Sequence, residues 1–227
     1  MKIVVLAGGL SPERNVSLST GYMVCQALRE KGHQVALVDL FFGLEDHDGA
    51  LEELYTAPVP EQFKKVERQA PDLEQVRASR KDKSPSAIGK GVLELCARAD
   101  LVYLGLHGTC GEDGRIQAMF DLMGIPYTGA GYTSSAIAMD KDLTKRMVSG
   151  KVITPKWDVV TVTDENLDAV LEQTELPVVV KPIASGSSIG VFIAHDREEL
   201  EHALEVSRQL GGRTVIEQYI KGREMSV

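Results

Sequence analysis

The chain has 227 residues, 43% of them hydrophobic, which is enough for one large domain or two ordinary ones with proper cores. Its formal net charge of -8 at pH 7 argues against a surface built to hold nucleic acid or an anionic membrane, because both require clustered lysine and arginine. No apolar run approaches the roughly 20 residues that span a bilayer, and the N-terminus lacks the apolar stretch of a signal peptide, so we expect a cytoplasmic protein.

The first elements have the pattern of a parallel α/β fold. Residues 2–7 form a short apolar run that ends in Gly8-Gly9, which predicts a buried strand followed by a turn. Apolar residues recur at helical spacing over residues 15–31, and residues 34–40 predict a second strand. A strand, a helix and a strand at this spacing form a βαβ unit, which favours a parallel sheet.

The first domain continues after an irregular stretch. Residues 42–89 mix acidic, basic and proline residues, and we interpret them as a variable insertion without a regular pattern of helices or strands. Beyond them we predict a helix over 88–98, a strand over 101–106, a helix over 115–123 and a short strand over 125–128. We therefore assign residues 1–130 to a Rossmann-like parallel-sheet domain.

The second domain, residues 131–227, has a different pattern. One helix is predicted over 134–151. Strands predicted at 156–162, 177–181, 190–194 and 214–219 then alternate with helices at 164–173 and 196–210. Strands joined across a short turn are antiparallel, so we expect an α+β antiparallel sheet with helices on one face.

Two candidate sites follow strand ends of the first domain, where open parallel sheets bind their ligands. In the first, Gly8-Gly9 and Glu13 lead into a helix; the alternative is that the glycines make a turn and Glu13 complements the helix dipole. The second is the glycine-rich loop that begins at His107. Because exposed backbone N–H groups of such a loop suit a carboxylate or phosphate, we favour a functional role for it over a structural histidine.

Two more candidates lie in the second domain. Lys181 closes an apolar strand, and the loop after it offers hydroxyl groups and free amides, as an anion clamp requires. It is not a Walker A loop, because the lysine precedes the glycines. We favour a phosphate contact over a flexible hairpin with a solvated lysine. The segment 217–224, taken alone, is a strand end followed by a polar turn.

Together these segments resemble the D-alanine–D-alanine ligase family of the ATP-grasp superfamily, and their order and spacing match across essentially the whole chain. The matching motifs are Gly8-Gly9-Leu10-Ser11-Pro12-Glu13-Arg14-Asn15-Val16-Ser17, His107-Gly108 with Gly111-Glu112-Asp113-Gly114, Met139-Asp140-Lys141, and Lys181-Pro182 with Gly186-Ser187-Ser188-Ile189-Gly190. The resemblance implies that ATP phosphorylates one D-alanine and that a second D-alanine attacks the acyl phosphate, for peptidoglycan precursor synthesis.

The resemblance also implies three catalytic residues. Glu13 is similar to the residue that anchors the ammonium group of the first substrate, and His107 to the residue beside the acyl phosphate. Ser187 is similar to a loop serine that hydrogen-bonds the first-substrate glutamate and covers the site.

The same resemblance implies the nucleotide contacts. Lys141 and Lys181 are similar to lysines that hold the phosphates, Glu217 to the acceptor of the adenine amino group, Ile220 to the hinge residue whose backbone meets the ring, and Glu224 to the ribose acceptor. The full predicted set is Lys141, Lys181, Ser188, Glu217, Gln218, Ile220 and Glu224. Gln218 departs from the family, which often has lysine at this position.

The resemblance further implies Mg²⁺ as a cofactor, with ligands from a third domain that family members carry beyond these residues. We accordingly predict no metal ligands within this chain. Since ATP-grasp enzymes hold the nucleotide between two antiparallel sheets, we expect that the 227 residues alone do not catalyse ligation. The resemblance also implies a homodimer formed through the first domain.

Three alternatives stay open. A related ligase that makes D-alanyl-D-lactate or D-alanyl-D-serine would share the first-substrate residues. A nicotinamide-dependent oxidoreductase is disfavoured by the absence of a Gly-x-Gly-x-x-Gly fingerprint and by the antiparallel second half. The third alternative is a non-catalytic fragment or binding module.

Overall fold

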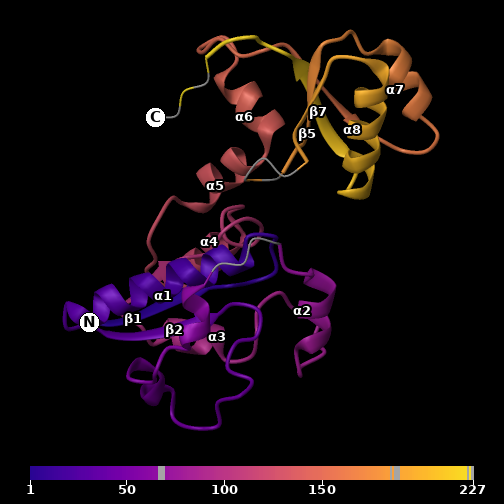
Figure 1. Ribbon diagram of the computed structural model, residues 1–227. Coiled ribbons are helices and arrows are strands. Elements are labelled where there is room, and N and C mark those ends of the chain that lie inside the picture. The colour runs from indigo at the N-terminus through magenta and orange to yellow at the C-terminus, as the bar shows by residue number, and fades with distance from the viewer. Residues whose placement is uncertain (66–69, 185, 187–189, 224, 226–227) are drawn as a thin grey trace. The chain divides into compact units, whose positions relative to one another are not determined.

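The computed structural model describes residues 1–65, 70–184, 186, 190–223 and 225 (Figure 1). The chain divides into two compact units, Met1–Ala136 and Ile137–Val227, and we describe each by itself. The domain boundary expected from the sequence, after residue 130, falls within the first unit.

A parallel sheet of three strands, in the order β2-β1-β3, organises the first unit. Val4 in the middle of β1 pairs with Ala36 of β2 on one side and with Val102 of β3 on the other. The predicted parallel sheet is therefore confirmed. The elements up to the third strand are β1 (Lys2–Ala7), α1 (Arg14–Glu30), β2 (Gln34–Asp39), η1 (Leu51–Tyr55), η2 (Glu61–Lys64), α2 (Leu73–Ser79), α3 (Val92–Ala97) and β3 (Leu101–Leu104).

Two elements of this unit differ from the prediction. Helix α3 begins at Val92 and not at residue 88, because Gly91 has the left-handed backbone angle φ of 79° and so precedes the helix. The predicted strand at 125–128 is reduced to one parallel bridge between Val102 and Tyr127. It follows α4 (Arg115–Met123), which has the predicted bounds.

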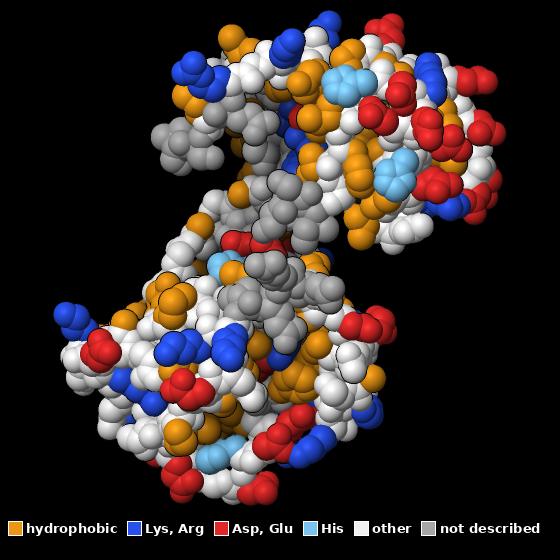
Figure 2. Space-filling view, in the orientation of Figure 1, with side chains coloured by type: hydrophobic (Ala, Val, Ile, Leu, Met, Phe, Trp, Pro, Cys, Tyr) orange, Lys and Arg blue, Asp and Glu red, His pale blue; other side chains and the backbone are white. Residues whose placement is uncertain are grey.

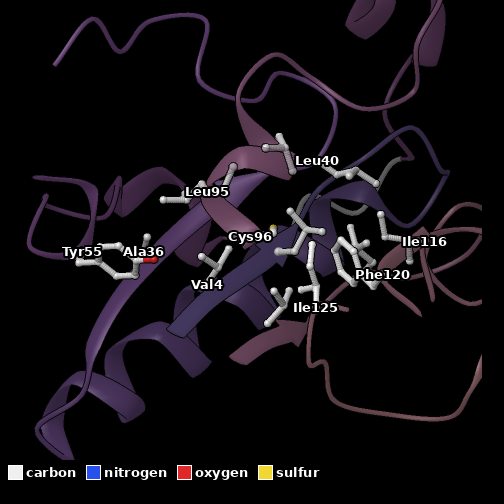
Figure 3. Packing of buried hydrophobic residues seen from close by; sticks show 14 residues of the cluster. Val4, Ala36, Leu40, Tyr55, Leu95, Cys96, Ile116, Phe120 and Ile125 are labelled. Atoms are coloured by element: carbon white, nitrogen blue, oxygen red, sulfur yellow. The ribbon is translucent and has the colours of Figure 1, made fainter. Parts of the chain in front are cut away.

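The core of the first unit packs side chains of the sheet against α3 and α4 (Figure 3). Val4 of β1, Leu95 of α3 and Phe120 of α4 are each 0% exposed. Cys96 lies in the same cluster, and burial raises the pKa of its thiol to about 12. This cysteine is consequently a protonated core residue and not a reactive thiolate.

A buried arginine anchors the irregular stretch between β2 and α3. Arg80 is 1% exposed, and its guanidinium lies 4.3 Å from the centroid of the Phe41 ring. It donates hydrogen bonds to main-chain carbonyl oxygens, namely those of Phe41, Asp82, Ser84 and Ser86. Because a guanidinium presents five N–H donors in a rigid fork, one side chain holds several turns of this stretch against the core.

An antiparallel sheet of four strands, in the order β4-β7-β5-β6, organises the second unit and confirms the predicted α+β half. Val180 of β5 pairs with Phe192 of β6 and with Ile216 of β7. The elements after α5 (Tyr132–Met139), which spans the division between the units, are α6 (Lys141–Val148), β4 (Trp157–Thr161), α7 (Leu167–Gln173), β5 (Val178–Pro182), β6 (Phe192–Ala194), α8 (Arg197–Gln209) and β7 (Arg213–Gln218).

The single helix predicted over 134–151 is wrong, because α5 ends at Met139 and α6 starts at Lys141. Asp140 between them has an extended backbone, and its carboxylate accepts a hydrogen bond from the Leu143 N–H. An aspartate that caps a new helix in this way interrupts the preceding one. The break makes Lys141 the first residue of α6.

The two faces of the antiparallel sheet have different roles. Val178 and Val180 of β5 pack with Leu200 and other residues of α8 in one hydrophobic cluster. Since side chains alternate along a strand, Lys181 and its cross-strand neighbours face the other way. Helix α6 lies on that second face (Figure 1), so the expectation that helices cover one face only is wrong.

Acidic side chains gather over the part of the second unit that carries α7 and α8 (Figure 2). The exposed acids of α8 are Glu198, Glu199, Glu201 and Glu205. Among the residues that the structure describes, no helix combines the length and apolar character needed to cross a bilayer.

Candidate active site

In the first unit, one serine joins the loops that follow β1 and β3. The Ser17 Oγ atom accepts a hydrogen bond from the Gly8 N–H at 2.8 Å and donates one to the Gly105 carbonyl at 2.7 Å. Ser17 is 0% exposed and lies in the first turns of α1. The carboxyl ends of the two parallel strands are thereby tied together, as the predicted site requires.

A buried ion pair fixes the turn after β1. The Arg14 guanidinium pairs with the Asp39 carboxylate through both of its terminal nitrogens and donates to the Gly9 carbonyl at 2.7 Å. The two side chains are only 7% and 11% exposed. Gly8, with φ of 73°, leaves the space for this pair, because a Cβ atom there would lie 2.5 Å from an Asp39 carboxylate oxygen.

The structure brings the neighbourhoods of Glu13 and His107 together. The Ser11 hydroxyl donates to the His107 carbonyl at 2.8 Å and accepts from the Glu13 N–H at 3.3 Å. Glu13 precedes α1 without making a side-chain capping bond to it, and a Cβ atom at Gly108 would lie 3.2 Å from its carboxylate. The carboxylate thus lies against the His107 loop, which favours a ligand-binding role over a purely helix-capping one.

Thr20, which the sequence did not point to, contacts the histidine ring. Its Oγ1 atom lies 3.3 Å from the Nε2 atom of His107. Thr20 follows Glu13 by about two helical turns, so both side chains can lie on one side of α1. That spacing is the sequence signal that could have indicated it.

The loop after His107 differs from its predicted use as an anion cradle. The Gly108 N–H donates to the Glu112 carboxylate at 2.7 Å, and the Cys110 N–H donates to the Asp113 carboxylate at 3.0 Å. The loop's own acids therefore occupy these amides. Glu112 and Asp113 precede Gly114, the residue before α4.

In the second unit, three lysines converge on one glutamate. Lys181 of β5 pairs with the Oε1 atom of Glu217 on β7, and Lys145 of α6 lies 2.9 Å from the Oε2 atom. The main chain of Lys141 donates to the Ile183 carbonyl at 3.0 Å, which ties the start of α6 to the end of β5. Among the predicted nucleotide residues, the structure thus brings Lys141, Lys181 and Glu217 to one face of the sheet.

The charges of this cluster influence each other. Burial raises the pKa of the Glu217 carboxyl, but hydrogen bonds from Lys181 and Lys145 outweigh burial and hold the pKa below its ordinary value. Burial lowers the pKa of Lys141, and the positive charge of Lys181 lowers it further. The three lysines outnumber Asp140 and Glu217, the two carboxylates that act on Lys141, and the surplus of positive charge suits a polyphosphate.

Lys145 was missed by the sequence analysis. It is 9% exposed, donates a hydrogen bond to the Thr154 Oγ1 atom at 2.6 Å, and lies 5.0 Å from the centroid of the Trp157 ring. It follows Lys141 by one helical turn, and residues at this spacing share a helix face. The spacing alone could have indicated a second lysine at the site.

The remaining predicted residues are less constrained. Gln218 is exposed, and its N–H donates to the Lys156 carbonyl at 2.9 Å, while the Ile220 side chain is 58% exposed. Ser187, Ser188 and Glu224 lie outside the described residues. The described part of the chain contains no group of three or more His, Cys, Asp or Glu residues arranged to hold a metal ion.

A groove of about 960 Å³ also opens in the second unit. Its lining includes Val160, Val178 and Ile216, which belong to the apolar cluster on the α8 side of the sheet. The lining also includes Trp157, Glu217 and Gln218, so the groove borders strands that carry part of the candidate nucleotide site.

Both parts of the chain match known family profiles. The profile described as D-ala D-ala ligase N-terminus matches residues 2–130, and the one described as D-ala D-ala ligase C-terminus matches residues 151–227.

Individual relatives carry the same name. The chain is 38% identical over 230 residues to the D-alanine–D-alanine ligase of Lacticaseibacillus casei (strain BL23), covering 100% of this chain and 63% of that protein. It is 39% identical over 231 residues to the D-alanine–D-alanine ligase of Pediococcus pentosaceus, covering 100% of this chain and 65% of that protein. The chain thus spans less than two thirds of the length of these relatives.

Solved structures agree with these matches. The D-alanine–D-alanine ligase from Bacillus anthracis superposes with a TM-score of 0.63 at 28% identity, covering 98% of this chain and 58% of that one. The same enzyme complexed with ATP gives a TM-score of 0.64, with 98% and 60% coverage. Since the N-terminal family profile alone matches more than half of the sequence, this chain belongs to the D-alanine–D-alanine ligase family.

Proposed function

We propose that this chain forms the first-substrate and nucleotide-binding parts of an enzyme that uses ATP to join two D-alanines for peptidoglycan precursor synthesis. The observation that carries the proposal is the convergence of Lys141, Lys145 and Lys181 around Glu217 on one face of the antiparallel sheet. The named relatives and the ATP complex of the Bacillus anthracis ligase support it.

In this proposal, Lys141 and Lys181 bind the phosphates of ATP. Their ammonium groups offset the negative charge that builds up as the phosphoryl group moves from ATP to the D-alanine carboxylate. Glu217 accepts a hydrogen bond from the adenine amino group, and the backbone of Ile220, a residue that is 58% exposed, contacts the ring edge. The family resemblance is the basis for the remaining predicted nucleotide contacts, Ser188, Gln218 and Glu224.

The first D-alanine binds at the carboxyl edge of the parallel sheet. Glu13 pairs with its ammonium group, and His107, oriented by Ser11 and Thr20, lies beside the acyl phosphate. A carboxylate oxygen of this D-alanine attacks the γ-phosphorus, and ADP leaves. The amine of the second D-alanine then attacks the acyl carbon, and phosphate leaves. Ser187 stays a predicted contact of Glu13.

The test is phosphate release by the complete gene product with ATP, Mg²⁺ and D-alanine, with the product identified by mass spectrometry. We expect D-alanyl-D-alanine and one phosphate per dipeptide, and no release with L-alanine. A second set of assays replaces part of the D-alanine by D-lactate or D-serine. A preference for D-lactate or D-serine as the second substrate would identify a D-alanyl-D-lactate or D-alanyl-D-serine ligase instead. No phosphate release with any D-substrate would refute both assignments.

The cofactor and partner predictions form part of the same proposal. Because the described residues offer no acidic cluster for Mg²⁺, we derive no step through the metal. A homodimer through the first unit is supported by Val16 and Met23, which are 44% and 59% exposed and lie about two turns apart on α1. The cytoplasmic location that we expected from the sequence remains part of this proposal. A nicotinamide-dependent oxidoreductase is not retained, since both parts of the chain match ligase profiles.

A further inference from the structure

The two lysines that hold Glu217 differ in how firmly they are fixed. The Lys145 side chain is 11% exposed, and the Lys181 side chain is 21% exposed. Besides its 2.9 Å contact with the Glu217 Oε2 atom, Lys145 donates to Thr154 at 2.6 Å and lies over the Trp157 ring. Three residues thus surround the Lys145 ammonium, and we call Thr154, Trp157 and Glu217 the cage around Lys145. Lys181 instead stands at the strand end where the phosphates are proposed to bind.

The cage around Lys145 is itself supported. The Trp157 indole N–H donates to the Asp142 carboxylate at 2.9 Å, and the Arg146 guanidinium donates to both oxygens of the same carboxylate at 2.9 Å. The hydrogen bonds from Arg146 and from Trp157 lower the pKa of Asp142, which therefore remains an acceptor. Trp157 keeps its orientation as a result, and its ring limits the positions available to the Lys145 ammonium.

We propose that Lys145 is a positioning residue. When a nucleotide draws Lys181 to its phosphates, Lys145 keeps the Glu217 carboxylate charged and in place. The site is therefore selective for a 6-amino purine. This inference rests on the proposed function, in which Glu217 accepts a hydrogen bond from adenine. When the nucleotide binds, the adenine amino group replaces Lys181 as a partner of Glu217, while Lys145 remains in contact with this carboxylate.

The charge state of Glu217 decides which base it accepts. The charged groups that face it are Lys141 and Lys145 from α6 and Lys181 from β5, while Trp157 of β4 contributes a neutral ring. Once Lys181 contacts a phosphate, Lys145 is the main group that opposes the effect of burial on the Glu217 pKa. Without Lys145 the carboxyl binds a proton at higher pH. A protonated carboxyl donates a hydrogen bond and matches the 6-oxo group of hypoxanthine.

The first experiment measures the pKa of Glu217 in the nucleotide-free 227-residue chain, by NMR of ¹³C-labelled glutamate carboxyl groups assigned with Glu217→Gln. Lys145→Met is expected to raise this pKa relative to wild type although Lys181 is still present, and Lys145→Arg to restore it. An unchanged pKa in a folded Lys145→Met chain would overturn the proposal. If Lys145→Met does not fold, Lys145→Gln gives the same comparison with a neutral polar side chain.

The second experiment compares kcat/KM for ATP and ITP in the complete gene product between pH 6 and 8. We expect Lys145→Met to lower the ATP to ITP preference by about tenfold, most strongly at the lower pH, because discrimination depends on one hydrogen bond to the base. Lys145→Arg is expected to keep the wild-type preference. A purely structural role would lower both rates equally and leave their ratio unchanged.

The outcomes separate the two proposals. Ligation by wild type together with an unchanged ATP to ITP ratio in Lys145→Met would refute the role of Lys145 and leave the proposed function intact. No ATP-dependent ligation by wild type would refute the proposed function and, with it, the base selectivity that we assign to Lys145.

Discussion

Replacing Arg14 by methionine is expected to destabilise the first unit by about 3–5 kcal/mol, because removal of one partner leaves the Asp39 carboxylate buried without its counter-charge. Asp39 is 11% exposed, and the lost guanidinium also releases the Gly9 carbonyl. Against a typical domain stability of about 5–15 kcal/mol, this loss is large. Amide hydrogen exchange of β1, β2 and β3 would measure it, since Trp157 fluorescence reports on the second unit only.

Arg98→Met is the matched control for this prediction. Arg98 also pairs with carboxylates, those of Glu94 at 2.6 Å and Glu52 at 3.8 Å, but its side chain is 53% exposed. Solvent-exposed ion pairs contribute about 1 kcal/mol or less, so this variant should unfold nearly as wild type does. Equal losses in the two variants would show that burial of the Arg14–Asp39 pair has no special importance.

Lys181→Met in the complete gene product is expected to lower kcat/KM for ATP by roughly 100-fold or more, because in the proposed function this lysine is one of the cations that stabilise the transferring phosphoryl group. The fold should persist, since Lys145 still neutralises Glu217. Initial rates of phosphate release at varied ATP would measure the effect, with circular dichroism as the check on folding.

Lys151→Met provides the comparison for Lys181. Lys151 is an exposed lysine of the same unit, in the connection between α6 and β4. Its replacement removes one positive charge from the unit, as Lys181→Met does, and should leave kcat/KM close to the wild-type value. Wild-type rates in Lys181→Met would remove this lysine from the mechanism and return it to a structural ion pair with Glu217.

Prediction from the sequence succeeded where periodicity and strand ends carried the signal. The run before Gly8 predicted β1 with its observed bounds, and the short connections in the second half predicted an antiparallel sheet. It failed where one side chain changed local structure. A helix cap such as Asp140 does not change the apolar periodicity of the sequence around it, so α5 and α6 were predicted as one helix.

The site was predicted in part for a similar reason. Lys181 stands at a recognisable strand end, whereas Glu217 was predicted from the family resemblance alone. The structure pairs the two side chains across β5 and β7. Lys145 depends on tertiary packing, since only the approach of α6 to the sheet brings its ammonium beside Glu217 and Trp157. The hydrogen bonds of Glu112 and Asp113 to the amides of the His107 loop could not be predicted either, because hydrogen bonds within a loop produce no periodic sequence pattern.

The Arg80 anchor has a consequence for protein engineering. All four of its hydrogen-bond acceptors are main-chain carbonyl groups, which every amino acid supplies. The hydrogen bonds of Arg80 thus make no demand on the side chains of Asp82, Ser84 and Ser86, whereas its contact with the Phe41 ring requires that aromatic side chain. Upstream of it, Tyr55 of η1 is 3% exposed and belongs to the core, so a peptide tag is better placed in the exposed turn at residues 48–50, before that helix.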